Sequence, residues 1–184
     1  MTCVAAVVYD NVVYMGADSA GVAGTDLTVR ADQKVFTNGE FLIGFTSSFR
    51  MGQLLRYAFT PPKYYADEKD LYAYMVTDFI NAVRTCLKNG GYAQIDKGEE
   101  IGGIFLVGVR GRLFQVESDY QVGESAYPYS AVGCGEAYAL GALSVTHTID
   151  PEKRIQLALS TAENFSAGVR GPFVVLNTSM VNHV

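Results

Sequence analysis

The chain has 184 residues, of which 49% are hydrophobic and 18% charged, and 19 acidic residues against 14 basic ones give a formal net charge of −5. This length fits one domain, residues 1–184, with a core that needs no disulfides, and the composition excludes a disordered chain. Because the acidic balance comes without Lys or Arg clusters, we expect neither nucleic acid nor an anionic membrane as a partner.

The three cysteines, Cys3, Cys86 and Cys134, lie far apart and form no CxxC arrangement. They indicate neither a disulfide framework nor a zinc site, and His147 and His183 have no neighbours at metal-ligand spacing. The N-terminal segment lacks a basic region followed by an apolar core, so we expect no signal peptide and no membrane span. We therefore expect a cytoplasmic protein without a metal or cofactor.

Two hairpins are predicted before the first helix. Residues 4–9 and 12–17 are short apolar runs joined by Asp10-Asn11, and "KVFT" and "EFLIGF" flank Asn38-Gly39, the strongest short turn signal. The first two runs are apolar nearly throughout, which is typical of strands that are covered on both faces.

Two helices are predicted after these hairpins. A short one covers residues 49–59 and ends before Pro61-Pro62. A longer one covers residues 70–88, with Asp67 as its cap and Gly90 as its stop. Its apolar residues repeat at helical spacing: Leu71, Met75, Phe79, Val83 and Leu87.

The second half of the chain predicts a third hairpin, two helices and a last strand. The hairpin is "GGIFLVGVRGRLFQVES", which turns near Arg110-Gly111. The first helix is formed by the small residues of "GCGEAYALGAL", and the second begins at Asp150-Pro151. The last strand is "PFVVLNT". Strands and helices fall in separate blocks, which favours an α+β fold over an alternating nucleotide-binding sheet. The glycines of "GCGEAYALG" also lack the GxGxxG spacing.

Thr2, Asp18 and Lys34 together suggest an active site. Taken singly, each has a structural explanation, as a strand start, a strand end and a solvated lysine. A threonine hydroxyl is a weak nucleophile that needs a base, and a free α-amino group with a reference pKa of about 7.7–8.0 titrates near neutral pH. Removal of Met1 would give Thr2 such an amine. The Lys34 ammonium would favour the alkoxide, and Asp18 would keep that lysine charged.

Four stretches carry a family resemblance: "TCVAAVVYDNVVYMGADS", "QKVF", "LIGFTSS" and "AVGCGEAYALGAL". From Thr2 to about Leu176 the chain resembles the N-terminal-nucleophile hydrolases, in particular the proteasome β-type subunits and the bacterial HslV-type peptidase. This resemblance implies a four-layer αββα sandwich and a threonine peptidase that cleaves polypeptides. It also implies a homo-oligomeric ring or stacked rings, and an ATP-dependent unfoldase as a possible partner.

The resemblance also assigns roles by position. Thr2 matches the nucleophile, Asp18 and Lys34 match its supporting pair, and the backbone N–H of Ser47 matches the oxyanion donor. Such a donor contributes about 3 to 4 kcal/mol of transition-state stabilisation when it is well aimed.

The same comparison by position gives the substrate-binding residues. Phe45 and Phe49 match specificity-pocket positions, and they predict a preference for apolar or aromatic side chains. The substrate is expected to lie as an extended strand beside Val22 and the Ser47 loop, because pairing along a strand edge reads the backbone and tolerates many sequences.

The chain departs from the family pattern at three positions. Ser47 stands where the family usually has glycine, so either Ser47 tolerates that backbone or the loop differs. Cys134 stands where a serine helps to orient the threonine amine, and a thiol is a weaker donor and acceptor. Ser166 stands near a position that is often acidic. Cys3 is an alternative nucleophile only if it becomes N-terminal, so we interpret it as a buried strand residue.

Two alternatives to the peptidase therefore stay open. One is a catalytically silent ring or scaffold subunit of the same fold, in which Met1 is retained or the site is impaired. The other is an N-terminal-nucleophile amidohydrolase that acts on a small molecule, which would need a deeper pocket and no enclosing ring.

Overall fold

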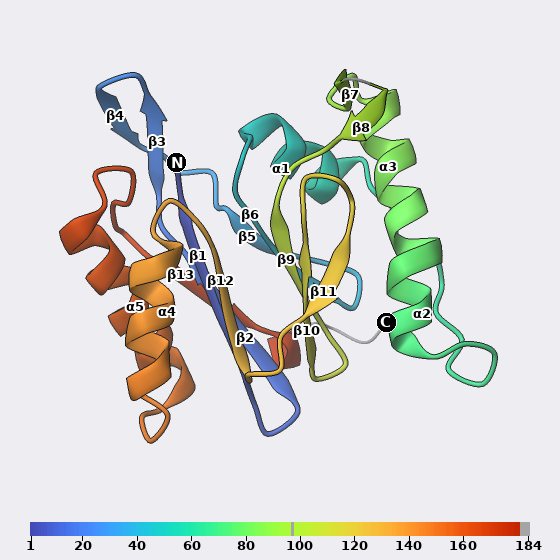
Figure 1. Ribbon diagram of the computed structural model, residues 1–184. Coiled ribbons are helices and arrows are strands. Elements are labelled where there is room, and N and C mark those ends of the chain that lie inside the picture. The colour runs from blue at the N-terminus through green and yellow to red at the C-terminus, as the bar shows by residue number, and fades with distance from the viewer. Residues whose placement is uncertain (97, 181–184) are drawn as a thin grey trace.

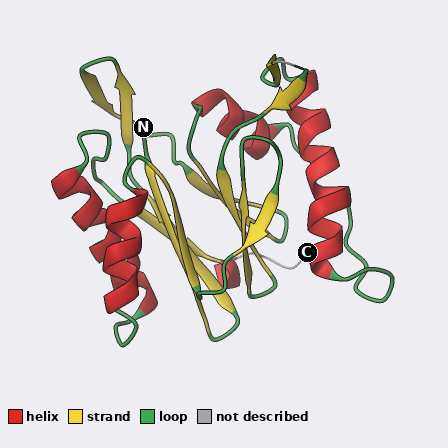
Figure 2. Ribbon diagram, in the orientation of Figure 1, coloured by secondary structure: helices red, strands yellow, loops and turns green. Residues whose placement is uncertain are grey.

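The computed structural model describes residues 1–96 and 98–180, which form two antiparallel sheets packed face to face between two layers of helices (Figure 1; Figure 2). The strand order is β12-β1-β2-β13 in the first sheet and β11-β10-β9-β6-β5 in the second. This arrangement confirms the predicted α+β fold and its four αββα layers.

The first sheet contains β1 (Cys3–Tyr9), β2 (Val12–Ala17), β12 (Tyr129–Gly133) and β13 (Val174–Asn177). The second contains β5 (Val35–Asn38), β6 (Phe41–Phe45), β9 (Phe105–Val109), β10 (Arg112–Val116) and β11 (Val122–Glu124). Two short hairpins pair outside these sheets, β3 (Ala20–Ala23) with β4 (Asp26–Val29), and β7 (Gln94–Asp96) with β8 (Glu99–Ile101).

The helices cover the two outer faces of the sandwich. The first sheet is covered by α4 (Glu136–Val145) and α5 (Pro151–Phe165), and the second by α1 (Phe49–Tyr57), α2 (Leu71–Tyr74), the π-helical segment η1 (Met75–Phe79) and α3 (Ile80–Asn89). A single 3-10 turn, η2 (Thr178–Met180), follows β13. Within residues 1–96 and 98–180, none of the helices is long and apolar enough to cross a membrane.

Strand β1 shows why its sequence is apolar almost throughout. Val4 and Ala6 pack between the sheets together with Leu42 and Leu106 of the second sheet. Residues at the alternate positions, including Cys3, pack under α4 and α5. Since successive side chains of a strand point to opposite faces, a strand between two covered faces needs apolar residues at every position. The prediction that both faces are covered is confirmed.

The turns confirm two predicted hairpins and correct the third. Asp10 and Asn11 have φ values of 47° and 64°, and Arg110 and Gly111 have 49° and 74°, as the mirror-image turns of two-residue hairpins require. In the hairpin of β5 and β6, Asn38 pairs with Phe41, so the turn is Gly39-Glu40 and not Asn38-Gly39.

Asn38 stays in its strand because its side chain has partners in α1 and in the segment that follows it. Its amide donates to the carbonyl oxygens of Leu55 and Phe59, both at 2.9 Å. The hairpin of β3 and β4 was not predicted from the sequence. All four residues of β4 are exposed, and its alternation of polar and apolar residues covers only four positions, the shortest run in which such a pattern indicates a strand.

The long predicted helix is present, but it is not a uniform α-helix. Its cap is Asp70, whose carboxylate accepts from the N–H groups of Tyr72 and Ala73, and not Asp67. The π-helical η1 interrupts it. Apolar residues at every fourth position drift by about 40° per step around a 3.6-residue helix, and a wider turn corrects this drift. All five repeat residues are accordingly buried against the second sheet.

We expect Gly44→Ala to destabilise the sandwich. A Cβ at Gly44 would lie 2.6 Å from both Val4 Cγ1 and Met15 Sδ, between the two sheets. Overpacking of this kind costs about 1 to 3 kcal/mol of the free energy of unfolding, which urea denaturation measures. The control is Gly123→Ala, because a Cβ at Gly123 meets nothing within 4 Å. Equal stability of the two variants would contradict the close approach of the sheets at Gly44.

Candidate active site

A buried ion pair joins Asp18, at the end of β2, to Lys34, at the start of β5. Lys34 Nζ lies 2.8 Å from Asp18 Oδ1, and the two side chains are 1% and 0% exposed. Burial lowers the pKa of the Lys34 ammonium, and the neighbouring Asp18 carboxylate opposes this shift because it favours the charged form. Two of the three predicted residues are therefore in direct contact, and Lys34 is not a solvated surface lysine.

The Asp18 carboxylate also binds three backbone N–H groups. Oδ1 accepts from Cys3 at 3.0 Å, and Oδ2 accepts from Ala20 at 2.9 Å and from Arg170 at 3.2 Å. These donors come from β1, β3 and the segment before β13. Asp18 thus fixes the backbone of the residue next to Thr2 relative to Lys34.

Thr2 is the third predicted member, and its surroundings come from the end of β12. Thr2 N lies 3.3 Å from Cys134 Sγ, and the Gly135 N–H donates to the Thr2 carbonyl at 3.3 Å. Ser166 Oγ donates to Cys134 Sγ at 3.3 Å. In the chain with Met1, the Thr2 hydroxyl donates to the Met1 carbonyl. The predicted residues Thr2 and Cys134 are therefore neighbours, and Ser166 lies behind Cys134.

Two glycines make room for this arrangement. A Cβ at Gly133 would lie 2.2 Å from the Thr2 carbonyl oxygen and 3.2 Å from Thr46 Oγ1. A Cβ at Gly168 would lie 2.7 Å from Cys134 Sγ and 2.5 Å from the Met1 Cβ. The first residue of the chain thus lies over Cys134, and the loop that contains Ser47 begins beside Thr2.

Ser47 lies in the loop between β6 and α1, with φ of +65°. This is the left-handed region, so Ser47 adopts the backbone that glycine adopts without strain. Its Oγ accepts from the Ile104 N–H at 3.0 Å, which holds the loop against the segment before β9. Within the described part of the chain, the exposed Ser47 N–H has no hydrogen-bond acceptor. It is thus available to an oxygen atom of a ligand.

A pocket of about 250 Å³ opens beside this loop. It contains Phe45 and Phe49, whose rings pack edge to face at 5.9 Å. Lys34 Nζ lies 5.7 Å from the centre of the Phe49 ring, so the pocket adjoins the ion pair. Val22 is paired with Leu27 in the hairpin of β3 and β4 and does not line this pocket. Two of the three predicted substrate-binding residues are thus brought together.

Cys3 is unsuited to be a nucleophile. Its side chain is completely buried under α5, and burial raises the pKa of its thiol to about 12, with the charge of Asp18 adding to the effect. The reactive form of cysteine is the thiolate. Cys3 therefore stays a protonated thiol in the core, which agrees with its interpretation as a buried strand residue.

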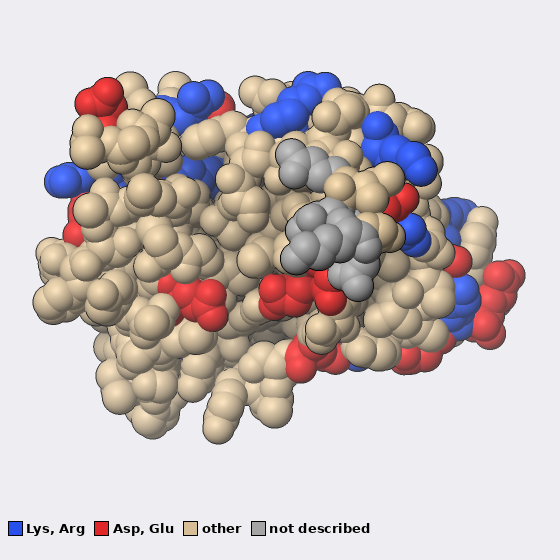
Figure 3. All heavy atoms as spheres, turned by 45° about the horizontal axis from the view of Figure 1, so that its top comes forward, with Lys and Arg blue, Asp and Glu red and all other residues tan. Residues whose placement is uncertain are grey.

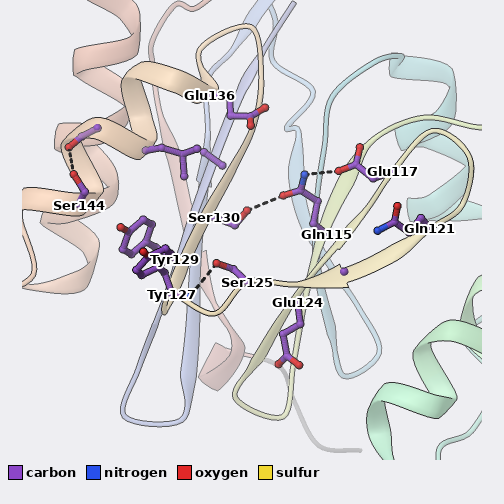
Figure 4. A pocket seen from close by; sticks show the side chains of 14 residues that line it. Gln115, Glu117, Gln121, Glu124, Ser125, Tyr127, Tyr129, Ser130, Glu136 and Ser144 are labelled. Atoms are coloured by element: carbon purple, nitrogen blue, oxygen red, sulfur yellow. Dashed lines mark hydrogen bonds between the residues drawn. The ribbon is translucent and has the colours of Figure 1, made fainter.

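A larger hollow of about 590 Å³ lies elsewhere, among β10, β11, β12 and α4 (Figure 4). Ser130 Oγ donates to Gln115 Oε1 at 2.8 Å, and Gln115 Nε2 donates to Glu117 Oε1 at 2.6 Å. Burial and the charge of Glu117 raise the pKa of Glu136. None of the predicted site residues lines this hollow, so it is separate from the threonine site.

The N-terminus and the hairpin of β3 and β4 lie at one end of the sandwich (Figure 1). With that end tilted towards the viewer by 45°, basic side chains lie mainly in the upper part of the visible face and acidic ones mainly in its lower part (Figure 3).

Sequence reasoning missed the part of the site that comes from the segment after α5. The Arg170 N–H binds Asp18, the Ser19 N–H donates to the Arg170 carbonyl at 2.8 Å, and Ser166 binds Cys134. These contacts span more than 30 residues of sequence, and two of them use backbone atoms. No local pattern could have shown them, although the family comparison had placed Ser166 close to the site.

No protein-family model matches the sequence, and no curated protein sequence matches it either. Its structure, however, is similar to that of BPH from Thiobacillus denitrificans, which has also been determined in complex with epoxomicin. The TM-score is 0.80 at 22% identity, over 96% of this chain and 97% of that one.

Two further structures share the fold. HslV from Trypanosoma brucei aligns with a TM-score of 0.67 at 16% identity, over 96% of this chain and 98% of that one. An Anbu mutant from Hyphomicrobium sp. strain MC1 aligns with a TM-score of 0.64 at 15% identity, over 95% of this chain and 80% of that one. These similarities confirm the proteasome-like fold that the sequence resemblance implies.

We expect Asp18→Ala to reduce the free energy of unfolding by about 3 to 5 kcal/mol, because it leaves a buried ammonium without its counter-charge. The matched control is Asp32→Ala, which breaks the exposed pair with Arg30, whose side chains are 38% and 44% exposed. Exposed pairs contribute about 1 kcal/mol or less. Urea denaturation compares the two, and similar losses would show that the buried pair is not structurally important.

The strain at Ser47 gives a second prediction. Ser47→Ala and Ser47→Gly both lose the hydrogen bond from Ile104, but only glycine relieves the left-handed backbone. Ser47→Gly is therefore expected to be more stable than Ser47→Ala by about 1 kcal/mol. The difference between their unfolding free energies is the strain that glycine relieves less the extra conformational entropy that glycine has in the unfolded chain. A Ser47→Gly variant that is less stable than Ser47→Ala would contradict a left-handed backbone at this position.

Proposed function

We propose that this protein, which shares its fold with HslV, BPH and Anbu, is a cytoplasmic threonine peptidase of the proteasome type. Thr2 is its nucleophile after Met1 has been removed, and its substrates are polypeptides. The observation that carries the proposal is the buried Asp18 carboxylate, which binds both the Cys3 N–H next to Thr2 and the Lys34 ammonium.

The proposed reaction uses the freed α-amino group of Thr2 as the base. The amine takes the proton from Thr2 Oγ1, and the oxygen attacks the peptide carbonyl carbon. The Ser47 N–H donates to the oxyanion. The protonated amine then gives its proton to the leaving nitrogen, and an ester links the substrate to Thr2. Water, activated by the same amine, hydrolyses this ester and restores Thr2.

The surrounding residues have supporting roles in this proposal. Lys34 lowers the energy of the alkoxide through its positive charge, and Asp18 favours the charged form of Lys34. Cys134 and Ser166 orient the threonine amine, since Thr2 N lies 3.3 Å from Cys134 Sγ and Ser166 binds that sulfur. Cys134 is a weaker hydrogen-bonding group than serine, and Ser166 partly compensates by supplying a hydroxyl at the same place.

The proposal includes a homo-oligomeric ring or stacked rings, because the fold is shared with HslV. A peptidase that reads mainly the backbone of an extended substrate gains selectivity when its sites are enclosed, since only unfolded chains reach them. An ATP-dependent unfoldase is the class of partner that would deliver such chains.

Thr2 variants test the nucleophile. Epoxomicin, which BPH binds, is the probe, and intact mass spectrometry reads both Met1 removal and the mass of the inhibitor. The wild type is expected to lack Met1, to gain one inhibitor per chain and to hydrolyse peptides. Thr2→Ala is expected to lose labelling and turnover completely, while Thr2→Ser keeps both at a lower rate.

The same experiment separates the alternatives. Retention of Met1 with no labelling, in a chain that still assembles, would contradict the peptidase and identify a silent ring subunit. Labelling of a monomer that hydrolyses small amides but no peptides would instead identify a small-molecule amidohydrolase. Light scattering measures the assembly in each case.

A further inference from the structure

The 250 Å³ pocket beside the Ser47 loop is lined by one face of α1. Phe49, Gly52, Gln53 and Arg56 all line it, and these positions, three and four residues apart, fall on the same side of the helix. A Cβ at Gly52 would lie 2.2 Å from the Phe45 ring, so this ring packs directly on the helix backbone. The pocket therefore has an aromatic base and polar residues further along the helix.

Arg30, which also lines the pocket, already has a partner. Its guanidinium binds Asp32 through two hydrogen bonds of 2.7 and 2.8 Å and lies 4.1 Å from the centre of the Phe49 ring. This ion pair holds the pKa of the Asp32 carboxyl below its usual range. Among the described residues that line the pocket, Asp32 is the one carboxylate, and Arg30 neutralises it.

Arg56 is different, because none of the described residues supplies a counter-ion for its charge. No carboxylate in the described part of the chain lies within 4 Å of it. Its guanidinium is half-buried and lies 5.5 Å from the centre of the Phe36 ring and 5.3 Å from that of Tyr57. The aromatic rings hold the guanidinium in place, and its N–H groups have no side-chain or backbone acceptor within the described part of the chain, so they can bind a planar, bidentate acceptor.

We propose that this pocket selects an acidic side chain, Glu or Asp, at the substrate residue that precedes the scissile bond. The proposal rests on the proposed peptidase function. The methylene groups of the substrate side chain lie on the Phe45 and Phe49 rings, and its carboxylate pairs with Arg56, the specificity-determining residue. This preference differs from the apolar one expected from the two phenylalanines, because the helix face adds charge that the residues nearest the loop do not carry.

Three fluorogenic peptide substrates test this proposal. Each is a peptide coumarin amide, and they differ only in the residue before the coumarin, which is Glu, Gln or Leu. Glu and Gln have the same shape, so their ratio of kcat/KM measures the charge alone. The assembled wild-type protein is expected to prefer Glu to Gln by about tenfold or more, since charge-assisted hydrogen bonds are roughly twice as strong as neutral ones.

Variants of α1 assign the effect to Arg56. Arg56→Gln is expected to bring the Glu to Gln ratio close to one, and Arg56→Lys to restore part of it. Arg50→Gln is the matched control, because Arg50 is exposed on the same helix and binds the Gly90 carbonyl, outside the pocket. Its ratio is expected to equal that of the wild type. A wild type that prefers Leu, or a ratio that Arg56→Gln leaves unchanged, would overturn the proposal.

Epoxomicin labelling of Thr2 in the same preparations separates this proposal from the one on which it rests. Labelled Thr2 with no preference for Glu refutes the acidic specificity and leaves the peptidase intact. Absence of labelling and of turnover refutes the peptidase, and the specificity with it.

Discussion

The buried pair of Asp18 and Lys34 is the interaction on which the geometry of the site depends. Two charges taken out of water are tolerated only when their remaining hydrogen-bonding capacity is satisfied, and Asp18 meets this condition with three backbone N–H groups in addition to Lys34. Because these partners lie on β1, on β3, next to β5 and on the segment before β13, the pair can form only when the two sheets have come together. The position of Thr2 is therefore a consequence of the completed fold.

The sandwich places this polar site at its end because its layers leave no room for polar groups inside. Both faces of β1 are packed, and the sheets approach each other so closely at Gly44 that a methyl group would not fit. The site consequently uses strand ends and loops, and one of these loops holds Ser47 in a strained backbone. Strain of this kind is retained where the surrounding contacts fix the conformation, as the hydrogen bond from Ile104 does here.

The size of a cavity is a poor guide to chemistry in this protein. The hollow among β10, β12 and α4 is larger, but its polar groups bind one another. The smaller pocket adjoins the ion pair and contains Arg56, a half-buried cation without a carboxylate partner in the described residues. An unpaired charge on an aromatic surface is a more specific sign of a ligand than volume, because it defines both the chemistry and the orientation of what it binds.

The sequence alone determined the features that depend on neighbouring residues. The turns at Asp10-Asn11 and Arg110-Gly111, the start of α5 at Pro151 and the covered faces of β1 follow from local backbone preferences and periodicity. The candidate triplet also came from the sequence, through the chemistry of its three residue types and through the family resemblance. Tertiary structure decided which groups meet: Arg170 and Ser166 reach the site, Asn38 binds α1 instead of forming a turn, and Arg56 joins the pocket. These contacts link residues distant in sequence, and many involve backbone atoms, which carry no residue-specific signal. Only packing determines their positions.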